Sequence, residues 1–275
     1  MGQKRFSLEG AESIIPALHQ TIQLGIFLGV EDFVFGMAHR GRLNILANIF
    51  EKPYESMFKE FDGIEYMEDE FDGDVKYHMG YSANISFKNQ SASLKLVPNP
   101  SHLETVNSVV QGICRAKIEK GHKNNEKKVF PILIHGDAAI SGQGVVYENL
   151  QMSQLNGYKT GGSLHIVINN QVGFTTNYLD GRSSTYCTDV AKTTLSPVLH
   201  VNGDDVEALI HALSFSVQYR QKFGKDVFID LLCYRKYGHN EGDEPRFTQP
   251  KLYKAIENHL NPFQIYAKKL LKDKV

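Results

Sequence analysis

Two short apolar segments separated by a helix-length stretch constrain the fold of this chain more than any other feature. Residues 129–134 and 164–168 are apolar and rich in β-branched side chains, and polar residues follow each segment. Residues 144–157 between them have room for a helix of about three turns. This order predicts a βαβ unit with parallel strands. Because the strands are almost continuously apolar, we expect helices on both faces of the sheet.

The residues after these two segments predict a metal site. Asp137 follows the first segment and Asn170 the second, and ligands of such sheets bind outside the carboxyl ends of the strands. Magnesium takes about six oxygen ligands, of which phosphates and water commonly supply several. We therefore expect Asp137, Asn170 and the backbone carbonyl of Val172 to hold magnesium beside a diphosphate, which Gly142 and Gly144 let the backbone approach. The alternative is that Gly-Asp and Asn-Asn only mark turns.

The same pattern recurs along the chain. Six apolar segments end in the polar sequences HR, PSH, GD, NN, NGD and GHN. Ordinary turns would place polar residues at both ends of strands equally. Here the histidines, amides and an aspartate gather at the carboxyl ends of the strands, and this predicts a ligand site on one edge of a parallel sheet.

Several of these polar residues also have a purely structural interpretation. His39 could be a hydrogen-bonded core histidine, and Arg40 and Arg42 could lie in a solvated turn or clamp an anion. His78 and Ser82 could belong to an aromatic-rich turn. The sequence from residue 101 to 104, SHLE, fits a capping box at the start of a helix.

Further elements follow from periodicity and capping. We expect helices at residues 8–28, 43–61 and 252–275, and a helix that Asp204 caps with Glu207 at the capping-box offset. Further strands are expected at 32–37, 93–97, 198–201 and 227–233. We expect an acidic surface loop at 62–74 and a loop at 175–188 that orders around a ligand.

Composition excludes several classes of protein. With 275 residues, 41% of them hydrophobic, and 30 basic against 31 acidic residues, the chain is typical of a globular domain. The balanced charge gives no reason to expect nucleic acid or a membrane as a partner, and no apolar stretch approaches about 18 residues. Three cysteines without CxxC spacing exclude a cysteine zinc site and suit a reducing compartment.

Longer runs of sequence resemble a known family. Gly136-Asp137 followed by Asn169-Asn170 is similar to the thiamine-diphosphate motif of decarboxylases and transketolases, with Ala138 in place of the commonest third glycine. The runs HGDAAISGQGVVYE, INNQVGFTT, GMAHRGRLN, GDVKYHMG, NPSHLE and CYRKYGHNE resemble the decarboxylating component of the 2-oxoglutarate dehydrogenase complex. The resemblance covers nearly the whole chain and is closest to the bacterial form.

The resemblance implies a fold and a set of site residues. The fold would be the diphosphate-binding α/β domain of thiamine-diphosphate enzymes, a mainly parallel sheet with helices on both faces. The implied catalytic residues are His39, His78, Ser82 and His239. The implied cofactor-binding residues are Arg40, Ser101, Leu103, Asp137, Ala138, Ala139 and Asn170, and the metal ligands would be Asp137, Asn170 and Val172. Histidines suit acid–base work near neutral pH, and the imidazole and hydroxyl of His78 and Ser82 suit a dicarboxylate.

The implied function is oxidative decarboxylation of 2-oxoglutarate with thiamine diphosphate and Mg²⁺. The succinyl group would pass to the lipoyl domain of a dihydrolipoyl succinyltransferase partner, and we expect a homodimer in the full-length protein. The location would be the cytoplasm of a bacterium or the mitochondrial matrix of a eukaryote. We expect residues 1–275 to form one domain of a longer polypeptide, with the pyrimidine-binding and C-terminal domains outside it.

Three other functions remain open. A relative specific for 2-oxoadipate shares most of these motifs, although the run HMGYS favours 2-oxoglutarate. The separate diphosphate-binding subunit of a branched-chain or pyruvate dehydrogenase is a second alternative, which KYHMG and NPSHLE disfavour. The third is a noncatalytic Rossmann-like phosphate-binding module. Its first strand–helix turn should carry GxGxxG, which the sequence lacks.

Overall fold

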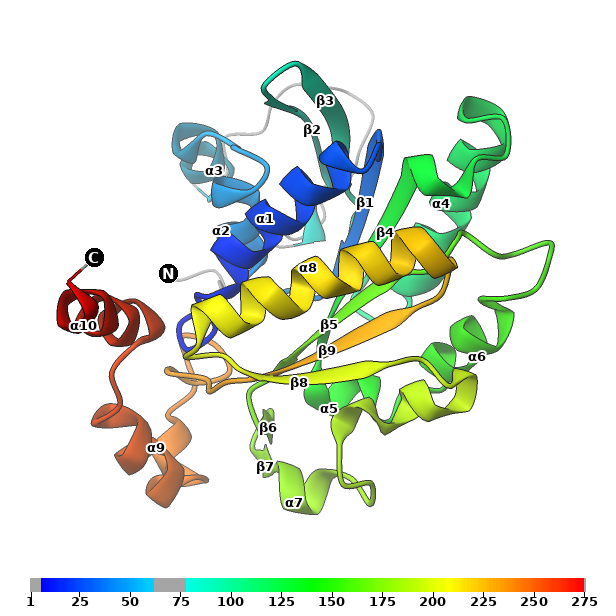
Figure 1. Ribbon diagram of the computed structural model, residues 1–275. Helices are drawn as coiled ribbons and strands as arrows, with labels where there is room; N and C mark the ends of the chain where they lie inside the picture. Colours follow the sequence, from blue (N-terminus) through cyan, green and yellow to red (C-terminus); the bar gives the residue numbers. More distant parts are fainter. Residues whose placement is uncertain (1–5, 62–77, 275) are drawn as a thin grey trace.

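The computed structural model describes residues 6–61 and 78–274, in which a seven-stranded sheet has the order β2-β3-β1-β4-β5-β9-β8 (Figure 1). Six strands are parallel, and β2 pairs antiparallel to β3 at one edge. The strands of this sheet are β1 (Asp32–Met37), β2 (Tyr81–Phe87), β3 (Gln90–Leu96), β4 (Val129–Gly136), β5 (Leu164–Asn169), β8 (Val198–Asn202) and β9 (Val227–Leu232). The predicted α/β fold with a mainly parallel sheet is confirmed. The expected acidic loop at 62–74 lies outside the described residues.

Helices cover both faces of the sheet, and two further α-helices follow its last strand in the chain. The longer ones are α1 (Ile14–Phe27), α2 (Arg42–Asn48), α3 (Tyr54–Phe61), α4 (Val106–Gly121), α6 (Gly144–Met152), α8 (Val206–Phe223), α9 (Pro250–Glu257) and α10 (Pro262–Asp273). Short helical segments are α5 (Asp137–Ile140), α7 (Tyr178–Gly181), η2 (Glu126–Lys128), η3 (Cys187–Thr194) and η4 (Pro245–Phe247). A small hairpin pairs β6 (Val172–Gly173) with β7 (Thr176–Asn177). No helix of the described residues is long and apolar enough to cross a membrane.

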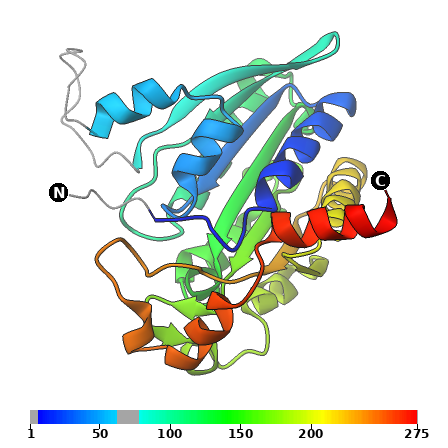
Figure 2. The same ribbon diagram turned by 90° about the vertical axis from the view of Figure 1, so that its left-hand side faces the viewer.

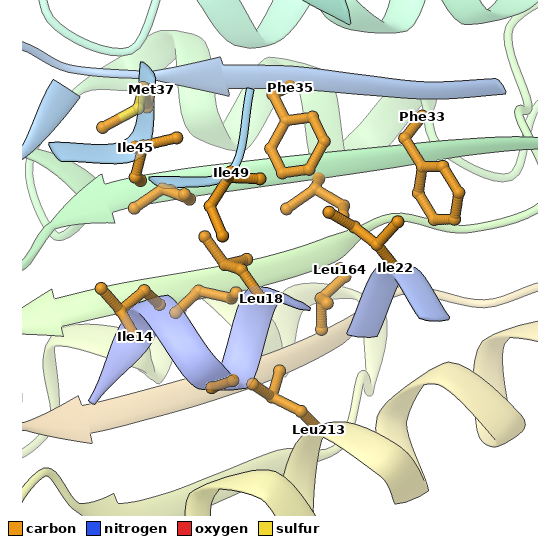
Figure 3. Packing of buried hydrophobic residues seen from close by; sticks show 14 of the residues in the cluster. Ile14, Leu18, Ile22, Phe33, Phe35, Met37, Ile45, Ile49, Leu164 and Leu213 are labelled. Carbon is orange, nitrogen blue, oxygen red and sulfur yellow. The ribbon is translucent and has the colours of Figure 1, made fainter. Parts of the chain in front are cut away.

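Alternate residues of the central strands pack on opposite faces of the sheet. Phe33 and Phe35 of β1 join the cluster formed with α1 and α8, whereas Val34 packs with α4. Figure 3 shows Leu18 and Ile22 of α1 pointing toward these β1 side chains. The second face is covered by α4, α6 and η3. Both faces are therefore buried, as the apolar strands predicted.

Three predicted helices have different limits in the structure. The first begins at Ile14 rather than near residue 8. The helix expected at 43–61 is two helices, α2 and α3, because Pro53 lacks the N–H that a continuous helix needs. The C-terminal helix is likewise divided at Pro262, where Asn261 caps α10. The loop expected at 175–188 contains β7 and α7.

The cap of α8 also differs from the prediction. Asp205, not Asp204, accepts a hydrogen bond from the backbone N–H of Ala208 at 3.0 Å. Asp204 instead contacts Nε2 of His259, which lies after α9, at 2.8 Å. Asp204 therefore joins the end of β8 to the segment between α9 and α10.

Candidate functional site

The carboxyl ends of β1, β4, β5 and β9 meet at one edge of the sheet, where two adjoining cavities of about 620 and 120 Å³ form a cleft. Figure 2 shows the orange segment after β9 lying beside β6, β7 and α7 at this edge. Ten of the predicted site residues line the cleft: His39, Arg40, Ser101, Leu103, Asp137, Ala138, Ala139, Asn170, Val172 and His239. A hollow of about 790 Å³ beside α9 is larger, but Asp137 and Asn170 do not line it. The smaller cleft therefore holds the groups with metal-binding chemistry.

The three predicted metal ligands line the same 120 Å³ cavity. Asp137 begins α5, and Asn170 and Val172 belong to the turn after β5. Oδ1 of Asn170 accepts a hydrogen bond from the Val172 N–H at 3.3 Å, which fixes the shape of the turn. In the described part of the chain, no group of three or more His, Cys, Asp or Glu side chains is arranged so that it could hold a metal ion. A cation here would be held by one carboxylate, an amide and a carbonyl, a donor set that fits magnesium.

Asp137 is buried, and burial raises the pKa of its carboxyl to about 6. Arg182 opposes this shift, with Nη1 at 3.4 Å from Oδ2 of Asp137. A buried carboxylate is costly unless a cation compensates it. The site therefore favours positive charge beside Asp137.

The turn that carries Asn170 is held by β9 and packs close to Ala138. Nδ2 of Asn169 donates to Oδ1 of Asp230 at 2.9 Å, and Nε2 of Gln171 donates to the Cys233 carbonyl at 3.0 Å. Gln171 has φ of 64°, in the left-handed region. A Cβ at Gly173 would lie 2.7 Å from that of Ala138, so only glycine permits this approach.

Two predicted histidines lie together at the rim of the cleft. The ring centres of His39 and His239 are 5.8 Å apart, and the two ring planes make an angle of 83°. The ring centre of Phe6 lies 4.0 Å from that of His39 and 5.4 Å from that of His239. Phe174 packs edge-on against His239 at 4.7 Å. Segments that follow β1, β5 and β9 thus meet around these two imidazoles.

Arg40 joins the segments on which those histidines lie. Its Nη1 donates to the Ser7 carbonyl at 3.0 Å and its Nη2 to the His239 carbonyl at 2.8 Å. Burial, followed by the charge of nearby Arg235, lowers the pKa of Arg40 to about 10. Arg235 in turn donates to the Phe174 carbonyl at 3.0 Å. Both arginines line the 120 Å³ cavity and bring positive charge to it.

Arg42 is a structural residue, contrary to the expectation of a solvated turn or an anion clamp. Its fully buried guanidinium donates to the carbonyls of Met37 (3.2 Å), Val97 (2.7 Å) and Met79 (3.2 and 2.7 Å). Burial lowers its pKa to about 10. Arg42 thus attaches the segment of His78 and Met79 to the ends of β1 and β3.

His78 and Ser82 are the two predicted site residues that the structure separates from the others. His78 is buried, and its carbonyl accepts from the Asn99 N–H at 2.8 Å. Ser82 is exposed on the edge strand β2, with β3 and β1 between it and β4. In the described part of the chain, neither residue lines the cleft. Their role toward substrate stays a prediction.

The expected capping box at residues 101–104 is wrong. The helix α4 begins at Val106, and Glu104 takes a left-handed conformation with φ of 70°. Its carboxylate is 2.6 Å from Nδ1 of His135 and accepts from Nδ2 of Asn107 at 2.9 Å. Glu104 therefore joins the loop of Ser101 and Leu103 to β4 instead of capping a helix.

Sequence reasoning missed Arg182, which lines the cleft, and Asp230, which supports the turn behind it. Arg182 lines the cleft beside Asp137, although Arg182 is not at a strand end, and only its place in the loop expected to order around a ligand could have indicated it. Asp230, behind Asn169, is the second of these, and its partner His200 lies on β8 with Nδ1 at 2.8 Å. Nothing in the sequence near Asp230 indicates this pairing.

Comparison with known proteins gives a consistent match over the whole chain. The model of the family described as dehydrogenase E1 component matches residues 1–275. The "2-oxoglutarate dehydrogenase E1 component" of Rickettsia conorii is 51% identical over 276 residues, covering 100% of this chain and 30% of that protein. The protein of the same name from Cupriavidus necator is 52% identical, covering 98% of this chain and 28% of that protein. The "2-oxoglutarate dehydrogenase, mitochondrial" of Dictyostelium discoideum is 50% identical, covering 99% and 27%. The chain thus spans less than a third of these relatives.

Proposed function

Because the chain belongs to the dehydrogenase E1 component family, we propose that residues 1–275 form the part of a 2-oxoglutarate dehydrogenase that binds thiamine diphosphate and Mg²⁺. The observation that carries this proposal is the convergence of Asp137, Asn170 and Val172 on one cavity at the carboxyl edge of the sheet. The donor set suits magnesium, and a parallel sheet binds ligands at this edge.

The residues of the cleft can be assigned to the cofactor as follows. The carboxylate of Asp137, Oδ1 of Asn170 and the carbonyl of Val172 would hold Mg²⁺ and, through it, the diphosphate. Ala138 and Ala139 follow Asp137 and leave room at the floor of the cleft, and Ser101, Leu103 and Arg40 line its walls. Bound thiamine diphosphate supplies an electron sink for decarboxylation of a 2-oxo acid.

The histidines would serve the substrate. His39 and His239, whose ring centres lie 5.8 Å apart at the rim, would orient 2-oxoglutarate and hold or move a proton at its carbonyl. His78 and Ser82 would contact the far carboxylate. Because they lie outside the cleft, this role requires that the substrate extend toward β2.

The rest of the reaction belongs to the whole protein. We propose that the cofactor's pyrimidine is bound by a domain outside residues 1–275 and that the full-length protein is a homodimer. The succinyl group would pass to the lipoyl domain of a dihydrolipoyl succinyltransferase. The names of the relatives, a 2-oxoglutarate dehydrogenase E1 component and a mitochondrial 2-oxoglutarate dehydrogenase, support the substrate class. The location would be the cytoplasm of a bacterium or the mitochondrial matrix of a eukaryote.

A thermal-shift comparison tests the proposal against a nucleotide-binding module. Thiamine diphosphate with MgCl₂ should raise the melting temperature, because a ligand that binds only the native state stabilises it. NAD and ATP at the same concentration should have little effect. A shift with NAD or ATP and none with thiamine diphosphate would contradict the proposal.

A further inference from the structure

Arg182 is a buried cation beside the carboxylate that carries the proposed metal site. Its side chain is only 9% exposed, and its Nη1 lies 3.4 Å from Oδ2 of Asp137. Its guanidinium also lies 5.3 Å from the centre of the Tyr178 ring. The residue lines the 620 Å³ cavity together with Ser101, Ala138 and His239.

The hydrogen-bonding capacity of Arg182 exceeds what the protein uses. A guanidinium has five N–H donors in a planar fork. The Nε atom of Arg182 is buried and has no hydrogen-bond partner among the described residues. Its contact with Asp137 is longer than the usual 2.7–2.9 Å of a charge-assisted hydrogen bond. Neutralising Asp137 therefore does not account for the orientation of the fork.

The chain around Arg182 is anchored on both sides, so the side chain is delivered to a defined place. Before it, the Tyr178 N–H donates to the Gln171 carbonyl, in the turn that follows β5, at 3.2 Å. After it, Cys187 and Val190 of η3 pack in the core with Phe228 of β9. This loop is therefore held against the sheet on either side of Arg182.

We infer that Arg182 binds the diphosphate of the cofactor directly, an inference that rests on the proposed function. An arginine fork matches the spacing of phosphate oxygens and can bind two of them at once. The diphosphate would be held by magnesium on Asp137 and by the guanidinium beside it. A cation at this place also offsets the repulsion between the carboxylate of Asp137 and the phosphates.

Calorimetric titration of the 275-residue chain tests this inference. Inorganic pyrophosphate and thiamine diphosphate, each with MgCl₂, are titrated into the wild type, Arg182→Gln, Arg182→Lys and the control Lys192→Gln. Lys192→Gln is a matched control because it also removes one positive charge from this part of the chain. The side chain of Lys192 is exposed and does not line the cleft. Arg182→Gln should weaken binding of both anions about tenfold or more, which corresponds to the loss of one charge-assisted contact. Arg182→Lys should be intermediate, and Lys192→Gln should bind as the wild type does.

The outcomes separate the two proposals. If Arg182→Gln binds both anions with unchanged affinity, the inference is overturned, and a lowered melting temperature alone would assign Arg182 only to the structure. If the wild type binds pyrophosphate through Arg182 but does not bind thiamine diphosphate, the proposed function fails while the anion site stands. Binding of neither anion contradicts both. If Arg182→Gln does not fold, the affinity of Arg182→Lys decides, and wild-type affinity there overturns the inference.

Discussion

Nδ1 of His135 lies 2.6 Å from Oε2 of Glu104, and this contact joins the end of β4 to the loop that carries Ser101 and Leu103. Nε2 of the same imidazole lies 3.0 Å from Nδ1 of His165 on β5. Burial and the neighbouring His135 lower the pKa of His165 well below its usual value, so the imidazole of His165 is neutral. One buried chain of polar side chains thus joins the wall of the cleft to β4, the strand that ends just before Asp137.

Removing Glu104 should destabilise the fold. In Glu104→Ala, His135 and Asn107 both lose a buried acceptor, and each lost partner costs about 1–3 kcal/mol. Urea unfolding of Glu104→Ala should show a loss in this range or above it. Glu119→Ala is the control, because Glu119 is exposed on α4, where it pairs with Arg115, and such pairs contribute about 0.3–0.5 kcal/mol. Equal effects of the two substitutions would show that the buried contact is unimportant.

Arg42→Ala should be among the most destabilising substitutions at this edge of the sheet. It removes the donor to the buried contacts at the Met37 and Val97 carbonyls and to the partly exposed Met79 carbonyl, and we expect the free energy of unfolding to fall by at least about 3 kcal/mol. Arg42→Lys should recover little, since an ammonium cannot reproduce the fork. Arg246→Ala, which removes an exposed local pair with Glu244, should change stability by less than about 0.5 kcal/mol. Chemical denaturation measures all three, and a mild effect of Arg42→Ala would contradict the role as a clamp.

Asp226 should give the fold a pH dependence of stability. Burial raises the pKa of its carboxyl to about 6, although the Ser163 N–H donates to it at 2.7 Å. The folded state therefore binds the proton more tightly than the unfolded state, and this stability is present below about pH 4 and lost as pH rises through about 6. As the pH rises from about 4 to above 6, the free energy of unfolding of Asp226→Asn should increase by about 3 kcal/mol relative to that of the wild type. Parallel unfolding curves at pH 4, 5, 6 and 7 measure the difference, and a constant difference would show that Asp226 does not titrate as stated.

A polypeptide limited to residues 1–275 should bind cofactor but not turn over 2-oxoglutarate. The described residues form one seven-stranded sheet, a small hairpin and the helices around them, and we propose that another domain positions the pyrimidine and shields the reacting atoms from water. The assay combines the purified chain with 2-oxoglutarate, thiamine diphosphate, magnesium and an artificial electron acceptor. Turnover of about one per second, as for an enzyme of moderate speed, would show that the second domain is dispensable.

The parts of the fold that depend on local patterns could be predicted from the sequence. The apolar segments at β1, β4 and β5 correspond to strands within one or two residues, and their polar ends meet at one edge because parallel strands share a direction. That is why Asp137 and Asn170 could be placed together without knowledge of the tertiary structure.

Contacts between distant segments could not be predicted. Asp230 reaches Asn169 only because β5 pairs with β9 in a register that places Val167 opposite Asp230. The sequence around Glu104 fits a capping box, yet the carboxylate bonds with His135 from a strand 31 residues away. At Glu104 a buried tertiary contact therefore overrides the local preference for a helix cap. At Arg42 the hydrogen bonds to distant carbonyls likewise override the local indication of a solvated turn.

Titration calorimetry of thiamine diphosphate with wild-type chain and Asp137→Ala, each with and without MgCl₂, tests the central claim most directly. The account predicts that wild-type binding requires magnesium and that Asp137→Ala loses at least about tenfold in affinity. Asp137→Asn should also weaken binding, because one formal charge opposite a dication is lost. Equal, magnesium-dependent affinities for the wild type and Asp137→Ala would contradict the assignment of the metal to this edge of the sheet.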